Sequence, residues 1–347
     1  MSVANVRAAG KILVIRGGAI GDFILTLPVL AALRSQFPQA RLEVMGYRHI
    51  AELAVAGGLA DDVRHIEARA LAGFFARRGE LLPELREYFA GFAVIVSYLY
   101  DPDTIFAENV ALCSKAQFIV GLHRPDNFGN VHATEVFLKP LERLAIFDAD
   151  PVPRLQVGQA SSLSGKPVTS IESSSEERLA SRQQAVLHVS EISDRLEGCP
   201  TLAVHPGSGS ERKNWPEPQW AELLRTIIDS SNAKLLLVGG EAEGERLHRL
   251  ARGLPSERIE LARSLPLPEL ARRLTGSAAF IGHDSGITHL AAAVGLPGLV
   301  LWGDTARAVW SPRSGRMRIL ESPKGLAELA VETVADELKA FRATGQG

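Results

Sequence analysis

The sequence predicts an α/β protein with two Rossmann-like, doubly wound domains that face each other across a cleft. Three observations support this prediction. Short apolar runs rich in β-branched residues alternate with helical segments, which is typical of parallel βαβ units. The alternation stops between residues 151 and 175, where Ser, Pro and Gly are abundant, and it restarts at residue 201. The length of 347 residues also suits two domains.

In the first half, four short apolar runs are expected to be buried strands. They are residues 11–16, 42–46, 92–97 and 117–120. Helices are expected between them at residues 22–37, 51–57 and 104–113. Pro28 lies inside the first of these helices and should kink it, because proline lacks the backbone N–H that a continuous helix uses.

The second half repeats this pattern. Four strands are expected at residues 201–205, 234–238, 278–282 and 298–302. Helices are expected at residues 217–229, 241–252, 267–274, 288–294 and 326–342, and a polar helix at 176–189 follows the linker. In doubly wound folds ligands bind at the carboxyl ends of the strands, so the cleft is the expected site.

Composition narrows the class of protein. The chain has 38 Lys+Arg against 40 Asp+Glu, a formal charge of −2, which argues against a nucleic-acid partner. Its two cysteines, Cys113 and Cys199, build no disulfide framework or cysteine zinc site, which suits the cytoplasm. The apolar run 23–33 is too short to cross a bilayer, so we expect a soluble protein, with peripheral membrane contact left open.

The first glycine-rich turn, RGGAIGD, ends on an acid. Gly18 and Gly21 shape the turn and Asp22 starts the helix. The turn lacks the G-x-G-x-x-G pattern of dinucleotide sites, and a carboxylate would repel a phosphate there. Asp22 is therefore either the N-cap of the helix or a general base that faces an acceptor hydroxyl, and spacing alone leaves both open.

A second turn, GHDSGITH, predicts an anion site at a helix start. Asp284 and Ser285 are good capping residues, Gly286 would let a ligand approach the backbone, and His289 follows Ser285 by one helical turn. The alternative is an ordinary capped helix with a surface histidine. A metal bound by His283, Asp284 and His289 is not favoured, because the spacing matches no standard site.

Two further loops follow strands of the second half. In HPGSGSERKNWP, Ser208 and Lys213 could contact a phosphate, although a solvated polar loop explains them equally well. In GGEAEGER, one of Glu241, Glu243 and Glu245 could bind ribose hydroxyls, although an exposed acidic helix start explains them too. The tripeptides DPD (101–103) and DAD (148–150) are discounted as metal sites.

Three blocks together resemble the bacterial heptosyltransferases, glycosyltransferase family 9. They are ILVIRGGAIGDFILTLPVLAALRSQFP, HPGSGSERKNWPEPQW and GHDSGITHLAAAVGLPGLVLWGDT. The resemblance implies the two-domain GT-B fold. It also implies inverting transfer of a heptose or related sugar from an ADP-sugar to a lipopolysaccharide-core or other glycan acceptor, with no cofactor and no structural metal. The ADP-sugar is then a substrate, and the partners are this donor and a glycan or glycolipid.

The resemblance also implies roles for single residues. Asp22 matches the family's catalytic base. Glu243 is the best match to a ribose-binding acid and Leu265 falls near the adenine-contacting position. The remaining nucleotide-sugar contacts are expected from Ser208, Lys213, Asp284, Ser285, Gly286, His289 and Thr305.

The resemblance divides the chain into an acceptor-side domain (1–158), a linker with the polar helix (159–190), a nucleotide-sugar domain (191–325) and a last helix (326–347) that packs back on the first domain. The segment HATEVF departs from the family, because Glu135 and Val136 stand where members with phosphorylated acceptors carry an Arg after a His like His132. The acceptor is therefore left open. A nucleotide-sugar epimerase of the same architecture and a non-catalytic nucleotide-sugar-binding protein are the alternative functions.

Overall fold

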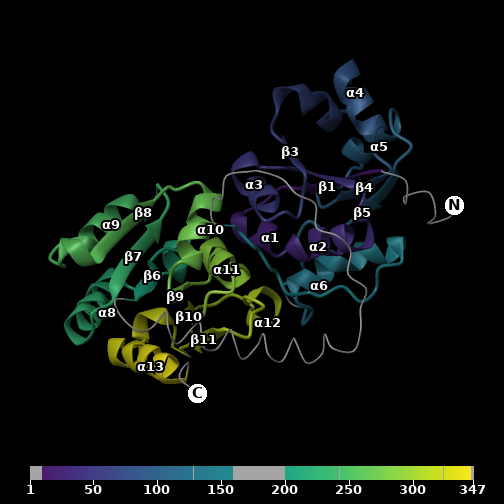
Figure 1. Cartoon of the computed structure of the whole chain (residues 1–347). Coiled ribbons are helices and arrows are strands. Elements are labelled where there is room, and N and C mark those ends of the chain that lie inside the picture. Colours follow the sequence, from purple (N-terminus) through teal and green to yellow (C-terminus); the bar gives the residue numbers. More distant parts are fainter. Residues whose placement is uncertain (1–9, 128, 159–199, 242, 323, 345–347) are drawn as a thin grey trace.

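Two parallel β-sheets, each covered by helices, form the two halves of the protein (Figure 1). The structure is a computed structural model that describes residues 10–127, 129–158, 200–241, 243–322 and 324–344. The expected linker and polar helix at 159–190 lie outside the described residues. In the described part, no helix is both long enough and apolar enough to span a membrane.

The first domain is built on a five-stranded sheet in the order β3-β2-β1-β4-β5, with every neighbouring pair parallel. Its strands are β1 (Lys11–Arg16), β2 (Arg41–Gly46), β3 (Asp62–His65), β4 (Val94–Ser97) and β5 (Gln117–Val120). Its α-helices are α1 (Ile20–Ile24), α2 (Leu27–Gln36), α3 (Arg48–Ala56), α4 (Pro83–Ala90), α5 (Ile105–Ala111) and α6 (Ala133–Leu138), with 3₁₀ turns η2 (Arg69–Phe75) and η3 (Lys139–Leu144).

The second domain has a six-stranded parallel sheet in the order β11-β10-β9-β6-β7-β8. Its strands are β6 (Thr201–His205), β7 (Lys234–Gly239), β8 (Ile259–Arg263), β9 (Ala279–His283), β10 (Gly298–Trp302) and β11 (Met317–Glu321). Its helices are α8 (Glu217–Ser230), α9 (Gly244–Ala251), α10 (Leu267–Thr275), α11 (Gly286–Ala293), α12 (Arg307–Trp310) and α13 (Val331–Thr344), with 3₁₀ turns η4 (Glu211–Lys213), η5 (Ser256–Arg258) and η6 (Leu326–Glu328).

Both sheets have the strand order of a doubly wound fold, so the predicted architecture is confirmed. The order reverses between β1 and β4 in the first sheet and between β6 and β9 in the second. Loops after strands at such switch points leave a crevice for ligands. The segments that follow β1, β6 and β9 carry Asp22 in α1, Lys213 in η4 and Asp284 just before α11, respectively.

The helix expected at residues 22–37 is two helices. α1 ends at Ile24 and α2 begins at Leu27, which places Pro28 in the first turn of α2. Proline is accepted there because the first N–H groups of a helix have no intrahelical acceptor. Leu25 and Thr26 separate α2 from the short α1, which contacts α11 of the second domain.

The last helix packs on the second domain, so the prediction that it returns to the first is wrong. Leu326, Val334 and Leu338 are buried in a hydrophobic cluster with α8 residues such as Leu223. The Trp215 Nε1 donates a hydrogen bond to the Leu329 carbonyl at 3.0 Å. Helical spacing correctly showed that one face is buried, but it does not identify the partner.

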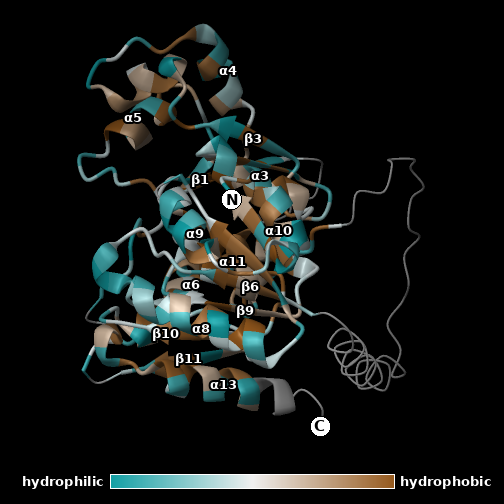
Figure 2. Ribbon diagram, turned by 90° about the vertical axis from the view of Figure 1, so that its left-hand side faces the viewer, coloured by the Kyte–Doolittle hydropathy of each residue, from teal (hydrophilic) through white to brown (hydrophobic). Residues whose placement is uncertain are grey.

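The domains share a hydrophobic cluster that includes α1, α3, α10 and α11. Figure 2 shows hydrophobic segments at β6, β9 and α11 inside the molecule. At the α1–α11 contact, a Cβ on Gly286 would lie 2.7 Å from the Ile20 Cβ, so glycine is required there. The Leu155 N–H also donates to the Ala293 carbonyl at 2.8 Å, which ties the end of the first domain to the second.

Candidate active site

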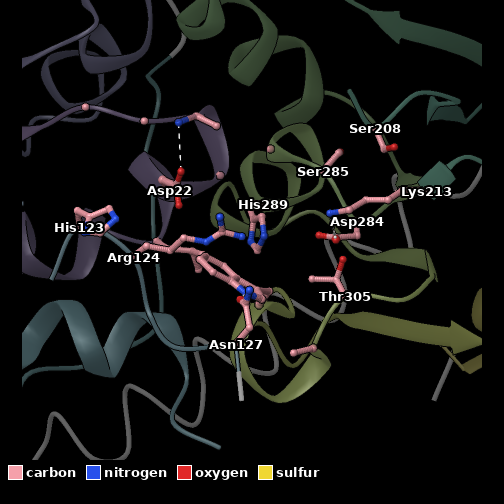
Figure 3. Close-up of a pocket in the computed structure, with 18 of the residues that line it drawn as sticks. Asp22, His123, Arg124, Asn127, Ser208, Lys213, Asp284, Ser285, His289 and Thr305 are labelled. Atoms are coloured by element: carbon pink, nitrogen blue, oxygen red, sulfur yellow. Dashed lines mark hydrogen bonds and ion pairs between the residues drawn. The ribbon is translucent and has the colours of Figure 1, made fainter. Parts of the chain in front are cut away.

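A cavity of about 840 Å³ lies between the two domains (Figure 3). The first domain contributes the turn at residues 16–22, residues 98–100 after β4 and residues 123–127 after β5. The second contributes the loop after β6, the start of α11 and residues 304–310. Ten of the residues expected from the sequence line this cavity: Gly18, Gly21, Asp22, Ser208, Lys213, Asp284, Ser285, Gly286, His289 and Thr305.

Asp22 caps α1 without being its N-cap residue. Ala19 is the N-cap, and Asp22 lies three residues later, where its Oδ2 accepts the Ala19 N–H at 3.2 Å. Gly18 has φ +99°, and a Cβ there would lie 3.0 Å from the Asp22 Oδ2. The Asp22 side chain is still 28% exposed and lines the cavity. The cap and the base are therefore compatible roles for one carboxylate.

Arg16, at the end of β1, lies behind Asp22. Its Nη2 is 3.5 Å from the Asp22 Oδ1, and its Nη1 donates to the His123 carbonyl at 2.7 Å. The guanidinium carbon lies 4.4 Å from the centre of the Phe137 ring. Burial lowers the pKa of Arg16, while Asp22 opposes this effect. Arg16 thus holds a positive charge beside the carboxylate, a contact that the strand pattern of KILVIR did not indicate.

The start of α11 has the capping geometry that the sequence predicted. Ser285 is the N-cap, and its Oγ accepts the Thr288 N–H at 3.2 Å. The first N–H groups of a helix carry partial positive charge, so this end suits an anion. Gly286 is required by its close approach to α1, and the expected approach of a ligand to its backbone stays a prediction.

His289 is a buried residue that reaches the cavity, so the alternative of a surface histidine is wrong. Its side chain packs against α1, where a Cβ on Gly21 would lie 3.3 Å from the His289 Cδ2. Burial lowers the pKa of His289 to about 4. The imidazole is therefore neutral at pH 7 and can offer a hydrogen-bonding nitrogen to a ligand without adding charge.

Lys213 and Asp284 form an ion pair at the centre of the second-domain wall. The Lys213 Nζ lies 2.8 Å from the Asp284 Oδ2, and the Asp284 side chain is only 10% exposed. Asp284 thus orients the lysine and offsets its charge. Beside them, the Ser208 hydroxyl contacts the Asn214 Oδ1 at 2.7 Å, and the Thr305 carbonyl accepts the Trp302 Nε1–H at 2.8 Å.

Glu243 and Leu265 do not line the cavity. The Glu243 Oε2 accepts the Gly240 N–H at 2.9 Å, and its carboxylate packs beside Gly207. Leu265 packs against the shared hydrophobic cluster. The competing Glu241 and Glu245 are exposed and also lie outside the cavity lining. A ribose or adenine contact from these residues therefore stays a prediction.

His283 fixes the loop that carries Lys213. Its Nε2 accepts the Trp215 N–H at 2.7 Å, so the neutral ring carries its proton on Nδ1, which lies 3.3 Å from the Gly207 carbonyl. Burial lowers the pKa of His283 to about 3. This histidine was considered from sequence only as a metal ligand, whereas the structure gives it a positioning role.

We expect the free energy of unfolding to fall as the pH is lowered from about 6.5 towards 4. The folded-state pKa values of His283 and His289 lie near 3 and 4, below the ordinary value of 6.5. Below pH 6.5 the unfolded chain therefore binds more protons than the folded protein. The stability that the neutral rings provide is complete above pH 6.5 and is lost as the pH falls. Urea unfolding at several pH values measures this loss.

The variant His283→Gln isolates the contribution of the His283 ring to the pH dependence of the free energy of unfolding. Its amide oxygen can accept the Trp215 N–H, and glutamine gains no proton in this range. Its free energy of unfolding should fall less steeply between pH 6.5 and 5 than that of the wild type. Equal slopes would show that His283 does not cause the dependence.

The loop after β5 adds residues that the sequence reasoning missed. His123, Arg124 and Asn127 line the first-domain wall. The Trp310 Nε1 donates to the Asn127 Oδ1 at 2.7 Å across the domain boundary, and the Arg124 guanidinium lies 5.7 Å from the Trp310 ring centre. The only available signal was the polar run HRPDN after an apolar strand, at the sheet edge where ligands bind.

The unusual segment HATEVF is also an interdomain contact. The His132 Nε2 lies 2.8 Å from the Ser311 carbonyl, and Glu135 forms an ion pair with Arg313. Glu135 thus joins the domains instead of lining the cavity. Among the described residues there is no cluster of three or more His, Cys, Asp or Glu side chains that could hold a metal. Of the discounted acids, Asp101 caps α5 and Asp150 pairs with Arg154.

Comparison with protein families gives one match that spans more than half of the chain. Residues 157–338 match glycosyltransferase family 9 (heptosyltransferase). The chain belongs to this heptosyltransferase family. Its first-domain turn with Asp22 lies outside the matched range, so the family match rests on the second domain and the residues that precede it.

Lipopolysaccharide heptosyltransferases of other bacteria match this chain over stretches of different length. Lipopolysaccharide heptosyltransferase 1 of Pseudomonas aeruginosa is 36% identical over 115 residues, 33% of this chain and 32% of that protein. The Escherichia coli K12 enzyme of the same name is 30% identical over 130 residues, 37% of this chain and 40% of that protein. The match therefore spans about a third of the length of these relatives. Lipopolysaccharide heptosyltransferase 3 of E. coli is 22% identical over 86% of this chain and 84% of its own.

Solved structures of family members share the fold along nearly the whole chain. E. coli ADP-heptose LPS heptosyltransferase II has a TM-score of 0.70 at 19% identity, covering 97% of this chain and 100% of that one. E. coli heptosyltransferase WaaC with ADP has a TM-score of 0.67 at 16% identity, covering 95% and 99%. The expected GT-B fold is thereby confirmed.

Proposed function

We propose that this family member is an inverting glycosyltransferase that moves a heptose, or a related sugar, from an ADP-sugar to a lipopolysaccharide-core or other glycan acceptor. Family membership supports a glycosyl transfer. The relatives in P. aeruginosa and E. coli are lipopolysaccharide heptosyltransferases, and one related structure was solved with ADP. These likenesses make an ADP-sugar the natural donor.

The observation that carries this proposal is that a partly exposed carboxylate and a helix start suited to an anion lie on facing walls of one cavity. A partly exposed carboxylate, Asp22, is on the first-domain wall. The opposite wall holds Lys213 and the start of α11, which both suit a phosphate (Figure 3). A base and an anion site on facing walls are what transfer from a nucleotide sugar to a hydroxyl requires.

In the proposed reaction the acceptor hydroxyl donates a hydrogen bond to Asp22. As the hydroxyl oxygen attacks the anomeric carbon, its proton passes to the Asp22 carboxylate. The bond between the anomeric carbon and the diphosphate oxygen breaks on the opposite face, so the configuration inverts. ADP leaves with the electron pair, and Lys213, Ser208 and the α11 N-terminus stabilise its charge. The proposal needs no metal ion, because these groups supply the positive potential.

Incubation with ADP-heptose and a truncated lipopolysaccharide core tests this function. We expect ADP release only when both substrates are present, and NMR of the product should show an inverted anomeric centre. A protein that alters the donor without an acceptor would be an epimerase. A protein that binds the donor but never releases ADP would be a non-catalytic binding protein. We place the reaction in the cytoplasm, at the inner membrane where a glycolipid acceptor is held.

A further inference from the structure

Arg16, the last residue of β1, carries a charge that the fold buries almost completely. The residue is only 3% exposed, although it lies at the wall of the reaction cavity. Its Nε is buried and has no hydrogen-bond partner among the described residues. A buried donor without a partner lowers the stability of a fold, and an apolar side chain of similar length would avoid this loss. Stability alone therefore does not explain an arginine at this position.

Aromatic rings hold the guanidinium group of Arg16 in place. Its central carbon lies 4.4 Å from the centre of the Phe137 ring and 5.8 Å from the centre of the Tyr98 ring. The Tyr98 hydroxyl donates to the Phe137 carbonyl, which joins the two segments that carry these rings. A contact between a cation and an aromatic ring is stronger where water is excluded. The guanidinium group thus has little freedom to move.

The two ends of the guanidinium group contact different elements. Nη1 donates to the His123 carbonyl at 2.7 Å, in the loop after β5, and Nη2 lies 3.5 Å from the Asp22 Oδ1 in α1. Within the described chain, Asp22 is the only acid with which Arg16 forms an ion pair. Figure 3 shows Asp22 and His123 on the same side of the cavity. One side chain therefore joins the proposed base to the loop that lines the first-domain wall.

Each oxygen of the Asp22 carboxylate consequently has a fixed neighbour. Oδ2 accepts the Ala19 N–H at 3.2 Å, and Oδ1 faces the Arg16 Nη2. The terminal torsion of an aspartate is otherwise broad, so a carboxylate that is 28% exposed could take several orientations. A general base must lie within hydrogen-bond reach of the proton that it accepts. Loss of the Arg16 contact would free the carboxylate to turn, while the Ala19 contact keeps it at the start of α1.

We propose that Arg16 is a positioning residue for sugar transfer, because its guanidinium group aligns the Asp22 carboxylate with the acceptor wall formed by the loop after β5. This inference rests on the proposed function, since it requires Asp22 to be the base. Arg16 acts through Asp22 and need not touch the reacting atoms. Arginine suits this role because its planar group reaches two partners in different directions, whereas lysine offers a single point charge.

The test is a double-variant cycle on sugar transfer from ADP-heptose to a truncated lipopolysaccharide core. We expect Arg16→Met to lower kcat by about 10- to 100-fold, because a misplacement of about 1 Å can reduce a rate by that much. The KM for ADP-heptose should stay unchanged. In the Asp22→Asn background, the same change should alter kcat by less than about twofold, because the carboxylate that Arg16 aligns is already absent. Arg16→Lys should have a kcat between those of Arg16→Met and the wild type, since it keeps the charge and loses one of the two contacts.

A purely structural role for Arg16 would give a different result. Its replacement would then lower kcat by a similar factor in both backgrounds, and this outcome would overturn the proposal. Arg258→Met is the matched control, because Arg258 bonds the carbonyls of Ile228, Ser231 and Ala233 and does not line the cavity. Its melting temperature should fall while its kcat stays unchanged. If Arg16→Met does not fold, Arg16→Lys is taken through the same cycle, with the same two outcomes.

The proposed function and the positioning role fail in different ways. A near wild-type rate in Asp22→Asn would remove the base, and with it the role of Arg16. A low rate in Asp22→Asn together with a wild-type kcat in Arg16→Met would overturn the positioning role alone. The transfer reaction with Asp22 as its base would then stand.

Discussion

Replacement of Asp22 by Asn should lower the rate of sugar transfer by roughly 10²–10⁴-fold, the usual contribution of a general base. Asparagine keeps the shape of the side chain, and its oxygen can still accept the Ala19 N–H that Asp22 accepts at 3.2 Å. It cannot take the proton of the acceptor hydroxyl. The rate should therefore fall while the cap of α1 persists.

Three measurements on Asp22→Asn separate lost chemistry from lost structure: melting temperature, ADP affinity by calorimetry and transfer rate. The ADP affinity should hold, because the proposed phosphate contacts are on the other domain. The melting temperature should fall only slightly, since Arg16 keeps its bond to the His123 carbonyl. Asp304→Asn, which removes another carboxylate from the same cavity, should retain most of the rate. A near wild-type rate in Asp22→Asn would leave Asp22 as a helix cap alone.

Replacement of Lys213 by Ala should weaken ADP binding by about 10- to 150-fold, which corresponds to roughly 1.5–3 kcal/mol for a charge-assisted hydrogen bond. The ion pair with Asp284 adds to this loss. Without the lysine, a carboxylate that is only 10% exposed would face the diphosphate unneutralised. Calorimetric titration with ADP measures the change.

The double variant Lys213→Ala, Asp284→Asn distinguishes these two effects. It should bind ADP more tightly than Lys213→Ala does, because the uncompensated negative charge is removed. It should still bind more weakly than the wild type if Lys213 contacts phosphate directly. An unchanged ADP affinity in Lys213→Ala would exclude the lysine from the donor site.

The sequence predicted the central strands well because these strands are buried on both faces. The runs at 11–16, 201–205 and 298–302 agree with β1, β6 and β10 at both ends, and the edge strand β5 was also found at 117–120. The three strands that were missed, β3, β8 and β11, lie at sheet edges. There one side meets solvent, polar residues are tolerated, and segments such as DVRH carry no apolar run.

Site residues could be predicted where the residue type and its position at a turn or helix start indicate the same role. Ser285 caps α11 as its residue type and position indicated. The sequence correctly placed Asp22 at the turn after β1. It did not show that Asp22 is the third residue of α1, because that depends on where the turn ends and the helix begins. The roles of Arg16 and Trp310 could not be predicted, because their partners His123, Phe137 and Asn127 are brought to them by folding across long sequence separations or between the domains.

The contact between α1 and α11 has a consequence for how such enzymes can be re-engineered. Ile20 and Gly286 touch across the boundary at a distance that admits no extra carbon, and Gly21 fits the ring of His289. A chimera that takes its first domain from another family member, in order to change the acceptor, would bring a foreign α1 against this surface. Such grafts should succeed only when the glycine-rich turn and the start of α11 are transplanted as a pair. The segments that must be exchanged together are thus the glycine-rich turn with α1 and the start of α11. They belong to different domains, so the linker is not a sufficient boundary for such a graft.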